Sequence, residues 1–107
     1  MVQGDDTKYF RVRLTVPRGD GWRQWGAVRG EFGRELAGQE STTVISPRVD
    51  SEVRRGRDYV RVVIVVTAAA PDVAEALDLA WWVFRKAAGD DAAGWDMSGA
   101  SAEVKPR

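Results

Sequence analysis

The sequence predicts one α+β domain, a four-stranded antiparallel sheet that carries two helices on one face. Two observations lead to this fold class. The spacing of apolar residues changes from two to about 3.6 and back along the chain, in the order strand, helix, strand, strand, helix, strand. The length of 107 residues suits a single hydrophobic core. We therefore treat residues 1–107 as one domain, with residues 1–7 as a loose N-terminal end.

The first half of the chain predicts a strand, a helix and a second strand. Residues 8–16 alternate apolar and polar side chains, which is typical of a half-buried strand. Residues 22–36 form an amphipathic helix with Asp20 as its N-cap. Residues 41–54 form a strand that is irregular at Pro47, where the missing N–H suits a sheet edge or a bulge. The stripe expected to face the core from the helix consists of Trp22, Trp25, Val28, Phe32 and Leu36.

The second half repeats the pattern. Residues 59–67 form the most apolar strand, and a helix follows with Pro71 at its first position. Residues 95–104 form a weaker strand, bulged near Gly99. With right-handed crossovers, this order gives the ferredoxin-like (βαββαβ) arrangement. The predicted buried stripe of the second helix consists of Val73, Leu77, Ala80, Trp81, Phe84 and Ala88.

Three glycines of the first helix, Gly26, Gly30 and Gly33, gather on one flank beside its aromatic stripe. We expect a ring of the second helix to approach this flank closely. The adjacent carboxylates Asp5 with Asp6 and Asp90 with Asp91 are expected to be solvated loop charges.

Composition narrows the possible chemistry. The chain has neither His nor Cys, which removes the usual general base, thiolate nucleophiles and the commonest transition-metal ligands. We therefore expect no metal and no cofactor, and these absences favour a non-catalytic role over an enzymatic one. Sixteen basic residues balance sixteen acidic ones, so no overall charge draws the chain to nucleic acid or to a membrane. The absence of a signal peptide or a long apolar segment predicts a cytoplasmic protein, and the richness in Arg, Ala, Gly and Val is typical of a bacterial genome of high GC content.

The segment RRGRDYVRV, residues 54–62, carries a local resemblance. Arg55, Gly56, Tyr59 and Val60 resemble positions one, two, five and six of the pattern on the third strand of RNA-recognition motifs, whose aromatic side chains stack on bases. Arg57, Asp58 and Val62 depart from positions three, four and eight of that pattern. Tyr9 on the first strand could supply a second stacking ring. The resemblance implies binding of a single nucleic-acid strand on the open face of the sheet.

The segment from Val62 to Val66 is apolar throughout, although a strand with one solvated face should alternate. If Val62, Ile64 and Val66 face the helices, Val63 and Val65 lie on the open face. We expect a partner to cover them, and a second copy of the chain across a twofold axis is the simplest cover. A terminal segment over the face, or valines left uncovered, are the alternatives.

Three functions follow from these patterns. The first is a non-catalytic interaction module that forms a homodimer, or binds a protein partner, through the open sheet face. The second is a binder of single-stranded nucleic acid on the same face. The third is a small-molecule binder or cofactor-independent enzyme with a pocket lined by Trp22, Trp25, Trp81 and Trp95, residues whose simpler role is core packing. The predicted contact residues of the open face are Tyr9, Arg11, Arg13, Tyr59, Arg61, Val63 and Val65.

Trp82 is predicted to be a secondary contact. It lies about 150° from the centre of the buried stripe on the helical wheel, among charged residues. The alternative is that its ring folds back over the glycine flank of the first helix.

Overall fold

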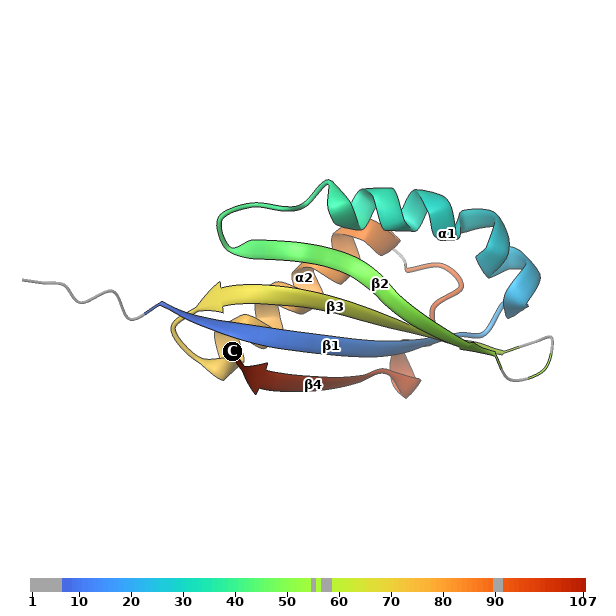
Figure 1. Cartoon of the computed structure of the whole chain (residues 1–107). Helices are drawn as coiled ribbons and strands as arrows, with labels where there is room; N and C mark the ends of the chain where they lie inside the picture. Colours follow the sequence, from blue (N-terminus) through green and yellow to red (C-terminus); the bar gives the residue numbers. More distant parts are fainter. Residues whose placement is uncertain (1–6, 55, 57–58, 90–91) are drawn as a thin grey trace, which may run out of the picture.

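The computed structural model describes residues 7–54, 56, 59–89 and 92–107 (Figure 1). Within these ranges the predicted order of strands and helices is confirmed. The strands are β1 (Lys8–Arg18), β2 (Val44–Arg54), β3 (Val60–Ala70) and β4 (Ser101–Pro106), and the helices are α1 (Gly21–Ala37) and α2 (Val73–Ala88). Among the described residues, neither helix is long and apolar enough to cross a membrane.

The four strands form one sheet in the order β2-β3-β1-β4, and each neighbouring pair is antiparallel. The α+β class and the antiparallel four-stranded sheet are therefore confirmed, and the strand order fits the ferredoxin-like arrangement. Since β2 and β4 each have one strand neighbour, they form the edges. Pro47 lies in β2, at a point where the register with β3 shifts, as its missing N–H predicts.

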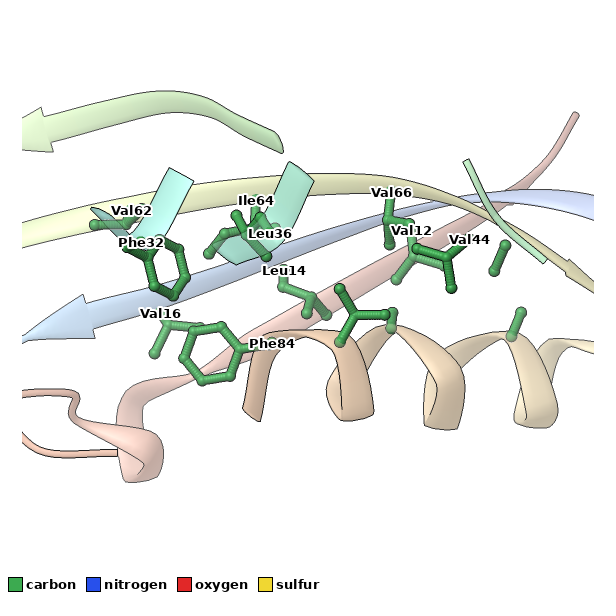
Figure 2. Close-up of a cluster of buried hydrophobic side chains, with 14 of the residues drawn as sticks. Val12, Leu14, Val16, Phe32, Leu36, Val44, Val62, Ile64, Val66 and Phe84 are labelled. Atoms are coloured by element: carbon green, nitrogen blue, oxygen red, sulfur yellow. The ribbon is translucent and has the colours of Figure 1, made fainter. Parts of the chain in front are cut away.

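The hydrophobic core lies between the sheet and the two helices (Figure 2). Each central strand contributes alternate residues, because successive side chains of a strand point to opposite faces. Phe32 and Leu36 of α1 and Phe84 of α2 pack against them. The buried strand residues on this helix-covered face are Phe10, Val12, Leu14 and Val16 of β1, Val44 of β2, and Val60, Val62, Ile64, Val66, Ala68 and Ala70 of β3.

The predicted stripes of both helices were partly wrong. Val28 and Val73 are exposed, whereas Ala76 and Val83 are buried. The buried face of α2 includes Ala76, Ala80 and Val83, so it is rotated from the stripe that the larger residues predict. Pro71 is also not the first helical residue, because the N-cap is Asp72, whose Oδ1 accepts a hydrogen bond from the backbone N–H of Glu75 at 2.9 Å.

Residues 95–104 do not form the continuous strand that was predicted. Trp95 makes one isolated bridge with Arg18, a short 3₁₀ turn spans Met97–Gly99, and β4 begins only at Ser101. The carboxylate of Asp96 explains the interruption. Its Oδ1 accepts hydrogen bonds from the Ser98 hydroxyl at 2.6 Å and from the Gly99 N–H at 3.3 Å, and such local bonds compete with a strand ladder.

Arg18 ties the end of β1 to the start of α1. Asp20 occupies the N-cap position of α1 but makes no side-chain bond to the helix, contrary to prediction. It pairs instead with Arg18, whose Nε donates to Asp20 Oδ1 at 2.9 Å. The Arg18 guanidinium is buried over the rings of Trp25 and Trp95, at 5.4 and 4.8 Å from their centroids. This cation–π cluster holds the end of β1 and the start of α1 together at one end of the core.

The glycine flank of α1 does not receive a ring. A Cβ atom at Gly26 or Gly33 would meet no other atom within 4 Å. The predicted close approach of α2 to this flank is therefore wrong, because the helices meet through Phe32 and Phe84, whose rings lie 5.9 Å apart.

Candidate functional site

The face of the sheet opposite the helices is the candidate site. Its residues on β3 are those that alternate with the core: Arg61, Val63, Val65, Thr67 and Ala69. The sequence predicted that a partner covers Val63 and Val65. They are instead only 8% and 1% exposed within a single chain.

Charged side chains of the neighbouring strands flank Val65, whereas Thr15 and Ser51 lie across from Val63. Arg13 of β1 and Arg48 of β2 lie directly across from Val65 in the two registers. Nη2 of Arg13 lies 3.4 Å from Oδ2 of Asp50, an ion pair that joins β1 to β2 and so passes over β3. Arginine side chains can cover apolar surface with their hydrocarbon stems while the guanidinium remains in water. The chain therefore covers its own valines.

The predicted contact residues therefore differ in how exposed they are. Tyr9, Arg11 and Arg13 are exposed on the open face, and Arg61 lies half-buried on it. Tyr59 is half-buried just before β3. Val63 and Val65 are almost fully buried within the single chain. Three positions of the motif comparison, Arg55, Arg57 and Asp58, and the carboxylate pairs at residues 5–6 and 90–91 lie outside the described residues.

A hollow of about 630 Å³ opens on this face. Its floor is formed by Val65 and Thr67 of β3, and its walls come from the other three strands. Four of its lining side chains are cationic, and none is acidic. The cations are Arg11 of β1, Arg48 of β2, and Lys105 and Arg107 at the end of the β4 segment, and Ser46 and Pro106 complete the lining.

A bulge in β2 shapes one wall of the hollow. Pairing with β3 shifts between Ile45, opposite Thr67, and Arg48, opposite Val65. Ser46 within the bulge has a φ of 51°, a left-handed conformation that is uncommon for residues other than glycine. Its carbonyl accepts a hydrogen bond from Nη1 of Arg48 at 3.0 Å. Bulges redirect side chains, and here the bulge directs Arg48 over the floor.

The end of the chain forms the opposite wall. The backbone N–H of Arg107 donates to the carbonyl of Tyr9 at 2.9 Å, which keeps this residue alongside β1. Nη1 of Arg107 donates to Oγ1 of Thr67 at 3.1 Å. Lys105 lies opposite Arg11, and its Nζ lies 3.5 Å from Oε1 of Glu103 in a largely exposed pair of the kind that contributes little. Arg107 is thus positioned, whereas Lys105 is loosely held.

Positive charge is concentrated in the hollow, whereas acidic side chains balance the positive charge next to it. Arg13 is paired with Asp50 and lies opposite Glu103 in the β1–β4 register. Among the described residues, Arg11, Arg48 and Arg107 have no carboxylate within ion-pair distance. The formal charge of zero for the whole chain conceals this local excess.

Of the four tryptophans expected to line a pocket, Trp95 borders a hollow of about 400 Å³, and all four pack against neighbouring side chains. The rings of Trp25 and Trp95 are in edge contact, with centroids 5.3 Å apart, and Trp81 meets Phe84 edge-on at 5.8 Å. Trp22 lies beneath the guanidinium of Arg54, 4.5 Å from its ring centroid. These contacts match the simpler packing role. In the described part of the chain, no three acidic side chains gather to hold a metal ion.

Trp82 lies on a second surface. Its side chain is 48% exposed, as its position on the helical wheel predicts, and Nζ of Lys86 lies 5.4 Å from the ring centroid. The ring borders a hollow of about 470 Å³ together with Glu35, Gln39 and Arg85. It does not cover the glycine flank at Gly26 and Gly33.

Comparisons with protein-family models, with curated proteins and with solved structures give no match to this chain. Function is therefore argued from the geometry of the face. Sequence reasoning had placed Arg11 on that face but missed Arg48, Lys105 and Arg107. The irregularity at Pro47 was the one sequence signal that marked this part of β2.

Proposed function

We propose that the chain is a non-catalytic module that binds single-stranded nucleic acid on the open face of its sheet. The observation that carries this proposal is the hollow with four cationic side chains and no acidic one on its walls. A phosphate backbone supplies the matching negative charge. Arginine suits this role because its planar guanidinium can donate two parallel hydrogen bonds to a phosphate.

The aromatic ring beside the hollow favours nucleic acid over an acidic polypeptide. Tyr9 is 49% exposed and lies two residues before Arg11 on β1, so the two share the open face. Two residues of a strand span about 7 Å. A base can stack on an exposed aromatic ring while its backbone runs through neighbouring cations, and such stacking tolerates any base.

The same face is a poorer candidate for self-association. Two copies placed face to face with the twofold axis near Val65 would bring two cationic hollows together, and like charges oppose such contact. The reason for expecting a covering copy has also gone, since Val63 and Val65 are already buried. The Trp82 surface remains a predicted secondary contact, and a cytoplasmic location also stays a prediction.

Fluorescence anisotropy with an end-labelled oligothymidylate of about twelve nucleotides tests the proposal. That length lies within the range that one strand-binding module covers, about 4–16 nucleotides. We expect binding that weakens steeply with added salt, because each phosphate neutralised releases counterions. Arg48→Ala combined with Arg107→Ala should weaken binding by about tenfold or more, since each charged hydrogen bond contributes on the order of 1.5–3 kcal/mol.

The matched control removes the same number of charges elsewhere. Arg23→Ala combined with Arg34→Ala changes two exposed arginines of α1 and should leave affinity nearly unchanged. Equal losses in the two double variants would show that binding is not localised to the sheet face. Polyglutamate that competes as well as the oligonucleotide would instead show that the face takes acidic polypeptides.

A further inference from the structure

Four of the cations described on the open face are grouped. Arg11, Arg48, Lys105 and Arg107 line one hollow, while Arg13 is paired with Asp50 and Arg61 lies half-buried outside the hollow. The internal phosphates of a strand recur at even intervals, with one negative charge each. A face built for them alone would carry evenly spaced cations. Grouped cations fit one group of higher charge.

We infer that the hollow is a subsite for the terminal phosphate of the bound strand, a phosphate monoester. This inference rests on the proposed function and specifies which part of the ligand occupies the hollow. A terminal phosphate carries about 1.5–2 negative charges at pH 7 and three strong acceptor oxygens. An internal phosphodiester carries one charge and has two free oxygens.

Coulomb's law predicts that the hollow prefers a terminal phosphate to an internal one. The attraction between two charges scales with their product, so every cation of the hollow attracts a dianion about twice as strongly as a monoanion. None of the lining side chains is a carboxylate that would repel the second charge. Of the acidic side chains described on this face, Asp50 is paired with Arg13 and Glu103 is paired with Lys105.

The positions of the guanidinium groups support a single compact ligand. Arg48 is anchored to the Ser46 carbonyl from the β2 side, and Arg107 is anchored to Thr67 from the β4 side. Both anchors use Nη1, which leaves other N–H groups of each fork for a ligand between them. Arg11 and Val65 lie between these two walls.

The ring of Tyr9 then offers a stacking surface to the nucleotide that adjoins the terminal phosphate. It precedes Arg11 on the same face of β1, and its cross-strand neighbour on β3 is the small Ala69. A ring can therefore lie over this region beside the hollow. With the terminal phosphate in the hollow, the first base lies over Tyr9, and the rest of the strand leaves the cationic region.

The test compares otherwise identical oligothymidylates that carry either a terminal phosphate or a terminal hydroxyl. The 5′ and 3′ ends are examined in separate probes, and the label is placed at the opposite end. At pH 8 we expect a phosphorylated end to bind about tenfold tighter, a step of about 1.4 kcal/mol. This preference should shrink towards pH 5, because the second pKa of a phosphate monoester is about 6. The chain contains no His that would titrate in this range.

Variants locate the effect. Arg48→Gln or Arg107→Gln should remove the preference for the phosphorylated end. Arg13→Gln changes an arginine of the same face that lies outside the hollow, so it should weaken both probes alike and keep the ratio. A mononucleotide should compete with the phosphorylated strand more effectively than the corresponding nucleoside.

The outcomes separate the two proposals. Equal affinity for both ends at pH 8, with binding retained, would overturn the terminal-phosphate inference and leave strand binding standing. Absence of binding by either probe would overturn the proposed function itself. A phosphoserine peptide that binds as tightly as the phosphorylated strand would show that the hollow recognises a phosphate monoester without nucleic acid.

Discussion

The two faces of β3 bury their side chains to a similar extent by different means. Val66 on the helix-covered face and Val65 on the open face are each 1% exposed. Val66 is covered by apolar residues of the core, whereas Val65 lies beneath arginine side chains of the two flanking strands. The helix-covered face excludes water and charge, while the open face keeps guanidinium groups in contact with solvent. Burial by itself therefore does not show what a surface can bind.

The difference explains how one strand can be apolar throughout without a partner. A run such as Val62–Val66 departs from the alternation of a half-solvated sheet. At Val65 the hydrocarbon stems of the two flanking arginines resolve the conflict, because they cover apolar atoms and present charge above them. The apolar floor and the cationic rim of the hollow are thus two results of the same arrangement.

Glutamate substitutions on the two faces of β3 should differ most in their effect on stability. Val66→Glu puts an unpaired charge in the core, and it should cost about 5 kcal/mol or more, since an uncompensated buried charge costs about 3–5 kcal/mol and the lost valine about 1.5 kcal/mol. Val65→Glu lies between Arg13 and Arg48 and should cost only about 1–2 kcal/mol, close to the lost burial alone. Urea unfolding followed by circular dichroism measures both.

The same variant tests the homodimer. We expect the wild type and Val65→Glu to sediment as monomers at tens of micromolar, because the open face is already covered within one chain. A wild-type dimer that Val65→Glu dissociates into folded monomers would instead restore the twofold contact through this face. Val65→Glu should also abolish strand binding, since it places a negative charge on the floor of the hollow.

Two aromatic residues of α2 extend the comparison to the helices. Phe84 is fully buried, and Phe84→Ala should cost about 3–5 kcal/mol. Trp82 is half-exposed, and Trp82→Ala should change stability by about 0.5 kcal/mol, as surface substitutions usually do. Thermal and urea unfolding give both values. A loss near 3 kcal/mol at Trp82 would place its ring in the core and remove the predicted secondary contact.

Local periodicity was enough to predict the order of the elements. Strict alternation in β1 predicted which side chains of that strand are buried, and it also predicted that Tyr9, Arg11 and Arg13 share the open face. The helical wheel predicted the exposure of Trp82. These features depend on neighbours within a few residues, so the sequence specifies them directly.

The remaining features depend on contacts between distant segments. Arg48 reaches the hollow through a one-residue shift in register, and Arg107 reaches it by pairing beside β1, 40 residues from the Thr67 hydroxyl that it bonds. Asp20 was assigned to the helix because the competing partner, Arg18, looks like an ordinary strand residue. Periodicity does not show such pairings. It also does not show that an arginine stem will cover a valine.

The smallest expected effect separates the stem of Arg13 from its charge. Arg13→Met keeps an unbranched apolar side chain over Val65 and removes the ion pair with Asp50. Because exposed ion pairs contribute about 0.2–1 kcal/mol, this variant should lose about 0.5 kcal/mol. Arg13→Ala removes the stem as well and should lose about 1 kcal/mol more, near the value of one buried methylene group. Urea unfolding in low and high salt distinguishes the two contributions: the loss from removing the ion pair should shrink in high salt, whereas the extra loss in Arg13→Ala should persist. Equal losses in both variants would mean that the stem of Arg13 does not cover Val65, and the cover would then fall to Arg48 alone.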